Sequence, residues 1–175
     1  SKIGSLNNHT YFISEGNQTY SNLLNTINSI NTAYPLTINN ENENAYITNY
    51  LQANSIQSVF IGLSDEVEEG KFTWYNNHPV TYTNWNTNEP NNAGGSENIS
   101  ALLQSGFWND VSASTSGKVI LELPFTVEQT QGLVSGESFP IGETTNTFLV
   151  NDGSGNTSTC SFTISVIEMP TPVVN

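Results

Sequence analysis

The segment from residue 64 to residue 96 constrains the fold most, because it is long and aromatic yet shows no regular apolar spacing. Apolar runs typical of strands flank it, at residues 58–63 and 99–103. Loops of this length without secondary structure of their own are uncommon in compact domains and are usually functional. The sequence therefore predicts a domain whose function depends on a long loop pinned by aromatic side chains.

The segments around this loop predict an α+β domain. Apolar residues recur at helical spacing over residues 19–31, and Pro35 prevents any extension of that helix. A second helix is expected over residues 41–53, with Asn39 or Asn40 as its cap. The strands expected outside the loop are residues 9–14, 58–63, 99–103 and 118–123.

After Pro124 the chain changes to short β-type runs separated by glycines, which is typical of part of a β-sandwich. These runs are residues 125–129, 138–141, 145–150 and 159–167. The predicted organisation is an N-terminal connector (1–10), an α+β domain (11–123), a partial all-β module (124–168) and a linker (169–175).

Charge and cysteine content exclude several functional classes. Lys and Arg total 3 against 16 Asp and Glu, for a net charge of −13, which argues against nucleic acid and anionic membranes as partners. The single cysteine, Cys160, excludes an intramolecular disulfide and a zinc finger. No apolar run approaches the ~20 residues of a membrane span, and no catalytic motif is present, so we expect neither membrane insertion nor an enzyme.

The main chemical signal is a group of acids and amides in two short segments. Calcium takes six to eight oxygen ligands from carboxylates, amide side chains and backbone carbonyls. The residues themselves leave two interpretations open, a calcium site and a solvated acidic loop. The group consists of Glu89-Pro90-Asn91, Glu97 and Trp108-Asn109-Asp110.

Over about residues 11–123 the order of these motifs resembles that of a C-type lectin-like domain of the mannose-binding type. The resemblance implies an α+β fold with two helices and a long calcium-binding loop region. The motifs that carry it are Val59-Phe60-Ile61-Gly62-Leu63, Asp65-Glu66-Val67-Glu68-Glu69-Gly70, Asn84-Trp85, Glu89-Pro90-Asn91 and Trp108-Asn109-Asp110.

The resemblance also implies a calcium site and a sugar site that share residues. The peptide bond before Pro90 would be cis, and two vicinal sugar hydroxyls would complete the calcium shell. The Glu-Pro-Asn order implies mannose-, glucose- or fucose-type sugars. The implied ligands of the principal calcium ion are Glu89, Asn91, Glu97, Asn109 and Asp110, of which Glu89, Asn91, Glu97 and Asn109 would also bind the sugar.

An auxiliary calcium site is implied beside the first. Asn98 stands where the family usually has an aspartate, so the site would hold one charge fewer and bind more weakly. Alternatively, Asp65 and Glu69 simply solvate a turn. The implied auxiliary ligands are Asp65, Glu69, Asn92 and Asn98, together with Glu97.

The disulfides of the family are absent from this chain. Ile99, Ala113 and Leu121 stand where cysteines are usual, and all three are apolar. Apolar packing is therefore expected to replace the disulfides. The absence of the disulfides should lower the stability of the fold more than it affects function.

The tail resembles the C-terminal part of a hyalin repeat, an immunoglobulin-like module of extracellular adhesive proteins. Its strands are too few for a complete sandwich, so apolar side chains would stay uncovered unless the lectin domain, the N-terminal residues or a neighbouring copy packs on them. We favour a neighbouring copy, in head-to-tail assembly. The side chains concerned are Phe139, Phe148, Val150, Phe162, Ile164 and Val166.

Two functions follow as hypotheses. The first is a secreted, calcium-dependent carbohydrate-binding adhesion domain, located outside the cell or at its surface. The second is a structural subunit of an extracellular fibre or surface layer, in which a calcium-stabilised lectin fold serves assembly.

Overall fold

The computed structural model describes residues 1–29, 32–151 and 156–168, and divides into two compact units, Ser1–Pro124 and Phe125–Asn175. The linker predicted at residues 169–175 lies outside the described residues. The helices are α1 (Tyr20–Ser29), α2 (Glu41–Ala53) and a 3-10 turn, η1 (Ala93–Gly95). The strands are β1 (Lys2–Leu6), β2 (His9–Ile13), β3 (Gln18–Thr19), β4 (Tyr34–Pro35), β5 (Ser58–Ser64), β6 (Thr73–Trp74), β7 (Ile99–Leu103), β8 (Trp108–Val111), β9 (Ser116–Pro124), β10 (Thr126–Gln131), β11 (Gly142–Asn151) and β12 (Thr157–Val166).

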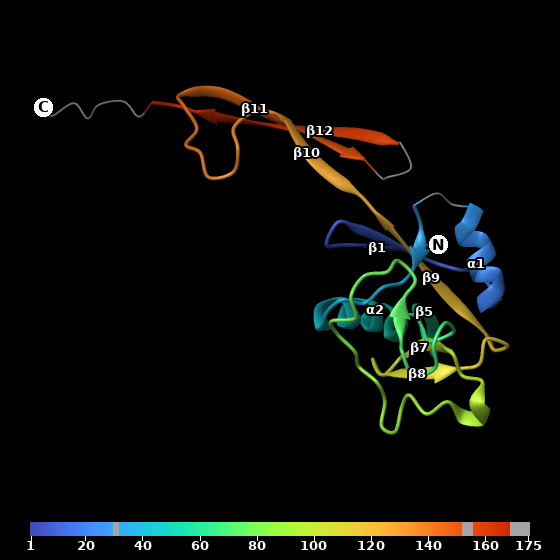
Figure 1. Cartoon of the computed structure of the whole chain (residues 1–175). Coiled ribbons are helices and arrows are strands. Elements are labelled where there is room, and N and C mark those ends of the chain that lie inside the picture. The colour runs from blue at the N-terminus through green and yellow to red at the C-terminus, as the bar shows by residue number, and fades with distance from the viewer. Residues whose placement is uncertain (30–31, 152–155, 169–175) are drawn as a thin grey trace, which may run out of the picture. The chain divides into compact units, whose positions relative to one another are not determined.

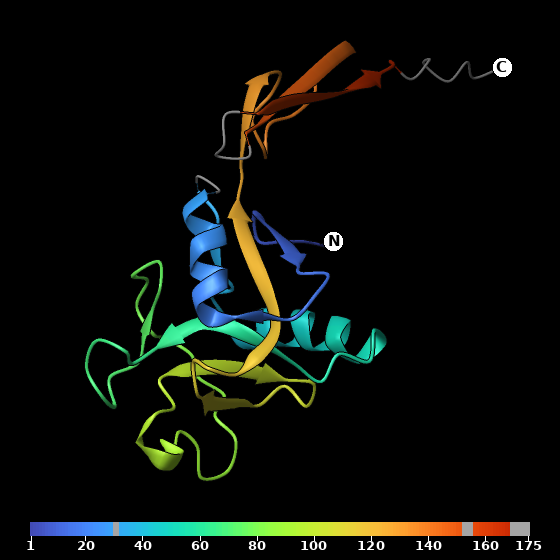
Figure 2. The same ribbon diagram turned by 90° about the vertical axis from the view of Figure 1, so that its right-hand side faces the viewer.

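The first unit is the expected α+β domain, built on one sheet of strand order β1-β2-β9-β5-β7-β8. β9 runs parallel to β5, and the other neighbouring pairs are antiparallel. The two helices lie beside this sheet, and the long loop, drawn in green, projects beyond β7 and β8 (Figures 1 and 2). No helix among the described residues is long and apolar enough to cross a membrane.

The N-terminal residues differ from the expected connector. β1 and β2 form an antiparallel hairpin, and β2 pairs in turn with β9. The amino group of Ser1 donates to the carbonyl of Ile13 at 2.6 Å, and the amide of Ile13 donates to the carbonyl of Ser1 at 2.8 Å. Sequence reasoning missed β1 because its alternation is short and contains a glycine, so only pairing with β2 makes it a strand.

Helix α2 begins where its cap predicts. The side chain of Asn40 accepts a hydrogen bond from the backbone N–H of Glu43 at 3.0 Å, which satisfies one free donor of the first turn. Glu41 and Glu43 place negative charge at the positive end of the helix dipole. Ile47 and Leu51 are fully buried, so one face of α2 packs on the sheet.

The core of the first unit has two parts. One joins α2 to the strands and contains the buried Trp74 and Trp108, and the other packs around Leu23 of α1 and Phe60 of β5. Ile99, Ala113 and Leu121, which stand at the cysteine positions of the family, all pack in or against this second part. Apolar contacts therefore occupy the places of the missing disulfides.

The second unit is a three-stranded antiparallel sheet, β10-β11-β12. Residues 138–141, expected as a strand, lie in the connection between β10 and β11. The register puts apolar residues on one face, where the rings of Phe148 and Phe162 stack with centroids 6.1 Å apart. On the other face, hydroxyl groups pair at 2.9 Å, Thr145 with Thr163. The residues that share the apolar face are Val127, Phe148, Val150, Cys160, Phe162, Ile164 and Val166.

Candidate functional site

Trp108 anchors the long loop to the core. Its side chain is fully buried, and its Nε1 donates a hydrogen bond to Oδ1 of Asn44 on α2 at 2.8 Å. Three aromatic rings of the loop region, those of Trp74, Tyr82 and Trp85, meet the Trp108 ring edge to face at centroid distances of 5.7–5.9 Å. This packing is the aromatic pinning that the sequence predicts.

The backbone of the loop runs alongside β8. The amide of Trp108 donates to the carbonyl of Asn84 at 2.9 Å, and the amide of Asn86 donates to the carbonyl of Trp108 at 2.8 Å. β8 was not expected as a strand, because its four residues carry two buried and two half-buried side chains without an apolar run. The pairing brings Asn109 and Asp110 next to the loop residues that follow Asn86.

Asp110 is the buried centre of the candidate principal site. Its side chain is 3% exposed; its Oδ1 accepts from the amide of Asn91 at 3.0 Å, and its Oδ2 from the amide of Asn92 at 2.7 Å. Burial by itself raises the pKa of Asp110, but hydrogen bonds from Glu89 and these two amides outweigh burial and hold the pKa below its usual value. Asp110 is therefore a carboxylate that shapes the loop and keeps its charge.

Glu89 supplies the second acid of the site. The Glu89–Pro90 peptide bond is cis, as expected. Oε1 of Glu89 accepts from Nδ2 of Asn91 at 2.8 Å, whereas Oε2 is buried and has no hydrogen-bond partner among the described residues. Once protonated, Glu89 can donate a hydrogen bond to the Asp110 carboxylate; this bond, followed by burial and repulsion from Asp110, raises the pKa of Glu89 to about 7. A positive charge is therefore favoured between the two acids.

The other two predicted ligands are tied to the same loop. Oε2 of Glu97 accepts from the amide of Ala93 at 2.8 Å, and Oδ1 of Asn109 accepts from Nδ2 of Asn86 at 3.3 Å. Glu97 and Asn109 are both half-buried, so their remaining oxygen lone pairs stay accessible. We call Glu89, Asn91, Glu97, Asn109 and Asp110 the long-loop site.

The residues predicted for the auxiliary site also lie together, in two pairs. The amide of Asp65 donates to the carbonyl of Asn98 at 3.1 Å, and each of these residues has a buried side-chain Oδ1 without a hydrogen-bond partner among the described residues. Nδ2 of Asn92 donates to Oε1 of Glu69 at 2.6 Å, and Oδ1 of Asn92 accepts from the amide of Glu97 at 3.1 Å. Asn92 and Glu97 thus connect the auxiliary residues to the long-loop site.

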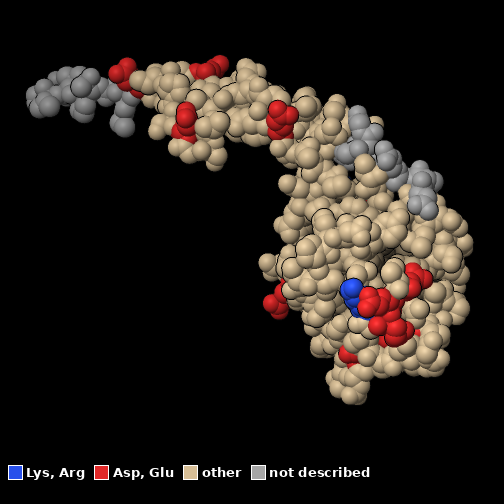
Figure 3. All heavy atoms as spheres, viewed as in Figure 1, with Lys and Arg blue, Asp and Glu red and all other residues tan. Residues whose placement is uncertain are grey.

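The surface around these loops is acidic. On the face shown in Figure 3, Asp and Glu gather on the first unit with very little basic surface beside them. Glu68 forms an ion pair with Lys71 at 2.9 Å, and both side chains are exposed, so this pair contributes little to stability. The acidic surroundings favour a cation as ligand.

The structure also brings together three residues that the sequence did not group. His9, Glu43 and Glu122 have ligand-type atoms all within 4.8 Å of one another. They come from β2, α2 and β9, which are far apart in the chain, so no local motif could reveal them. The long-loop site is not a group of this kind. Two of its five residues are amides, and the ligand-type atoms of its three carboxylates do not all lie within 4.8 Å of one another.

Two family models match the chain. The model of the lectin C-type domain matches residues 17–120, and that of the HYR domain matches residues 104–166. Residues 104–120 fall within both matches, and in the structure their strands β8 and β9 pair with strands of the first unit. C-type lectin domains generally bind Ca²⁺, which agrees with the acidic and amide oxygens of the loop.

Solved C-type lectin structures resemble the first unit. The C-type lectin CEL-I from Cucumaria echinata is 25% identical with a TM-score of 0.63, over 67% of this chain and 91% of that one. The cow CD23 carbohydrate-recognition domain is 26% identical with a TM-score of 0.58, over 67% and 88%. The human scavenger receptor C-type lectin domain, 24% identical with a TM-score of 0.60 over 69% and 94%, shows the same fold. The family model of the lectin C-type domain matches more than half of the residues of this chain. The chain therefore belongs to the C-type lectin domain family, and a HYR domain follows in its C-terminal part.

Proposed function

We propose that the long-loop site binds calcium and, through it, a sugar with two vicinal hydroxyl groups. The family and its structural neighbours support carbohydrate binding without catalysis. The observation that carries the calcium step is the buried Oε2 of Glu89, which has no hydrogen-bond donor among the described residues and shares its surroundings with the Asp110 carboxylate. A buried carboxylate oxygen beside a second carboxylate favours a positive charge between them.

The donor set fits calcium. Three carboxylates and two amide oxygens are hard ligands, and the loop leaves lone pairs on each. Asp110 holds the amides of Asn91 and Asn92, which fixes the loop, while Asn91 and Asn86 orient the side chains of Glu89 and Asn109. A bound calcium ion would offer free coordination positions to two sugar hydroxyls. The carboxylates would accept from those hydroxyls and the amide N–H groups would donate to them.

Mannose-type sugars are the class that we propose as ligands. The Glu89-Pro90-Asn91 order underlies this choice. The cow CD23 domain, similar in fold, was solved in the presence of a GlcNAc2Man3 oligosaccharide, which contains mannose. We further propose that Asp65, Glu69, Asn92 and Asn98 hold a weaker auxiliary calcium ion, because two of their buried oxygens lack partners.

A glycan array with calcium, and again with a chelator, tests this function. We expect mannose-type glycans to bind in calcium only. Sugar binding that persists after calcium removal would contradict the proposal, and so would calcium binding without any glycan ligand.

Assembly outside the cell is a second candidate function, favoured by the apolar face of the second unit. Phe162 and Val127 on this face are 51% and 49% exposed, which is much apolar surface to leave in water. We propose that a neighbouring copy covers this face in head-to-tail assembly. Lectin and HYR domains are typically extracellular or at the cell surface, and we propose the same location here, with module boundaries near residues 123 and 168.

Sedimentation velocity tests the assembly. Phe162→Ser should reduce association at high concentration, whereas Thr163→Ala on the opposite face serves as the matched control and should not. A wild-type chain that stays monomeric at high concentration would contradict assembly and leave the lectin function untouched.

A further inference from the structure

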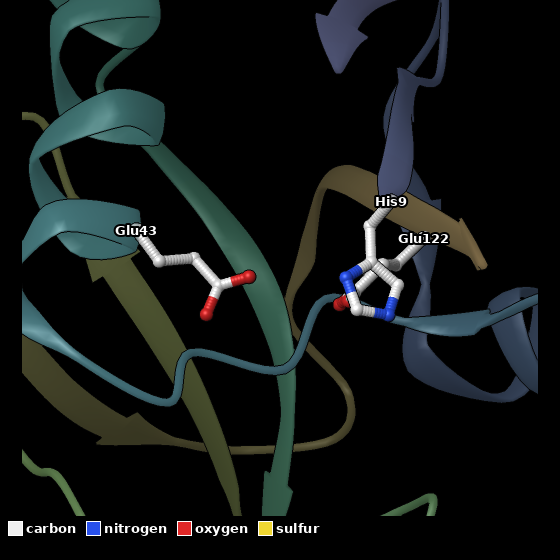
Figure 4. Close-up of side chains that lie close together, drawn as sticks. All are labelled: His9, Glu43 and Glu122. Carbon is white, nitrogen blue, oxygen red and sulfur yellow. The ribbon is translucent and has the colours of Figure 1, made fainter. Parts of the chain in front are cut away.

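Three ligand-type side chains meet inside the first unit, on elements that contribute nothing to the long-loop site. His9 lies on β2, Glu43 in the first turn of α2, and Glu122 on β9. Figure 4 shows the Glu43 carboxylate directed toward the His9 ring and the Glu122 carboxylate beside that ring. The ligand atoms all lie within 4.8 Å of one another, so a small side-chain shift would bring them to the bond lengths of about 2.0–2.2 Å around one zinc ion. We call these three residues the buried cluster.

Both carboxylates of the buried cluster are held by neutral donors. The side chains of Glu43 and Glu122 are 2% and 1% exposed. Oε1 of Glu43 and both oxygens of Glu122 each accept one hydrogen bond, which leaves a second lone pair free on each, whereas Oε2 of Glu43 accepts two, from the backbone and side-chain amides of Asn39. The donors to Glu43 are the Tyr11 hydroxyl (2.6 Å) and the Asn39 amide (2.8 Å), and those to Glu122 are the Tyr34 hydroxyl (3.2 Å) and the Thr37 amide (2.9 Å).

The buried cluster lacks a compensating cation from the protein. Among residues 1–29, 32–151 and 156–168, lysine makes one ion pair, between Lys71 and Glu68. Two buried carboxylates are costly unless a proton or a metal ion joins them.

The side chain of His9 is 24% exposed, and its ring faces the two carboxylates of the cluster. Its Nδ1 is buried, has no hydrogen-bond partner among the described residues, and lies 3.5 Å from Oε1 of Glu122. Oε1 of Glu122 already accepts from the Tyr34 hydroxyl, so the atom left without a partner is the imidazole nitrogen. A metal ion between them would give this nitrogen a partner and use the free lone pair of Oε1.

We propose that His9, Glu43 and Glu122 form a binding site for a divalent transition-metal cation of the zinc type. One nitrogen and two carboxylate oxygens suit zinc, whereas calcium takes oxygen ligands only. The tyrosine hydroxyls and backbone amides act as the outer hydrogen bonds that orient metal ligands. Because the ligands join β2, α2 and β9, the metal would link the N-terminal hairpin, a helix and the last sheet strand of a lectin unit that has no disulfide.

Zinc binding requires ionised carboxylates and an imidazole nitrogen without a proton. Zinc and protons therefore compete for the same atoms, so zinc affinity should fall as the pH is lowered. This property does not depend on calcium or sugar at the long-loop site.

Zinc titration by calorimetry on the chelator-treated full chain, with Co²⁺ absorption as a second probe, tests the proposal. We expect one zinc ion per chain, a higher melting temperature, and at least about tenfold weaker binding in His9→Gln and Glu122→Gln. Glu137→Gln, which changes an exposed acid of the second unit, and Cys160→Ser are matched controls that should bind zinc like the wild type.

Unchanged zinc binding in His9→Gln would overturn the assignment, as would loss of binding in either control. Mannoside binding in calcium, measured on the same variants, reports whether the fold is intact. If His9→Gln keeps sugar binding and loses zinc, the buried cluster is a separate metal site. If the wild type binds no zinc at all, the proposal fails while the lectin function stands.

Discussion

The long-loop site and the buried cluster place acidic side chains in opposite ways. The long-loop site takes its candidate ligands from one stretch, residues 89–110, and most of them are oriented by backbone amides and side chains of the same stretch. The buried cluster takes one residue from each of three elements, and its two carboxylates are almost completely inaccessible to solvent. A site for an exchangeable ligand needs the first arrangement, and a site that ties elements together needs the second.

This difference in burial indicates which role a metal ion would have at each site. At the long loop Glu89, Glu97 and Asn109 are half-buried residues, so a sugar would reach part of each side chain. At the buried cluster the two carboxylates are at most 2% exposed, so a cation bound there would stabilise the packing of β2, α2 and β9. Disabling one site should therefore leave the other unchanged, and the predictions below test that independence.

The largest effect is expected for Asp110→Ala. This change removes a charged ligand and the acceptor of two loop amides, so calcium affinity should fall by at least about 100-fold and sugar binding should disappear. Calorimetric titration with calcium measures this. Zinc binding should be retained, and unchanged calcium affinity would refute the site assignment.

A smaller effect is expected when acid and amide are exchanged, in Glu89→Gln with Asn91→Asp. The summed charge stays the same while the donor and acceptor order offered to the sugar hydroxyls is reversed. We expect preference to move from mannose-type to galactose-type sugars, by roughly tenfold in a competition assay. Mannose preference that survives the exchange would show that recognition comes from other residues.

Asn44 lies between the buried cluster and the long-loop site. It follows Glu43 on α2, and its Oδ1 accepts a hydrogen bond from Nε1 of Trp108, which anchors the long loop. Asn44→Ala leaves the buried Nε1 of Trp108 and the carbonyl of Gly106 without this partner. The free energy of unfolding should fall by about 1–3 kcal/mol. Denaturant unfolding measures this, with the exposed Asn49→Ala on the same helix as control, expected within about 0.5 kcal/mol of wild type. Equal stability of the two variants would contradict the role of Asn44.

The smallest effect concerns pH in the presence of chelator. The pKa of Glu122 is raised from 4.5 to about 8, so the folded state holds this proton more tightly than the unfolded state. Stability from this group is complete below pH 4.5 and is lost as the pH rises toward 8. The pKa of His9 is lowered, so its effect has the opposite sign: its contribution to the stability of the protein is lost as the pH falls below 6.5.

Comparison with Glu122→Gln separates these two contributions. Relative to this variant, the wild type should become progressively less stable between pH 4.5 and pH 8, as followed by thermal unfolding. Parallel stability curves for the two proteins would contradict the raised pKa of Glu122.

The sequence predicts what is local and misses what packing assembles. Helix α2 and its cap at Asn40 follow from neighbouring residues, and so do the acids and amides of the long loop. β1 and β8 depend on their partner strands, so their short and mixed patterns gave no signal. The expected strand at residues 138–141 failed because no neighbouring strand pairs with it in the described sheet.

The buried cluster, like β1 and β8, could not be predicted from the sequence. His9 is one of two histidines, and Glu43 has the ordinary explanation of an acid in a first helical turn. Glu122 alternates within an apolar strand, and only the pairing of β2 with β9 sets it beside His9. Nothing in the chain order indicates that these three meet, because their proximity is a property of the tertiary fold.

The central claim, that sugar binds through a cation held by the long-loop site, is tested most directly by linkage. The dissociation constant of a mannoside is measured over a series of free calcium concentrations, for the wild type and for Asp110→Asn. Sugar affinity should rise with calcium until the site saturates and should vanish without calcium, while the variant shows neither. A mannoside affinity that does not change with calcium would contradict the claim.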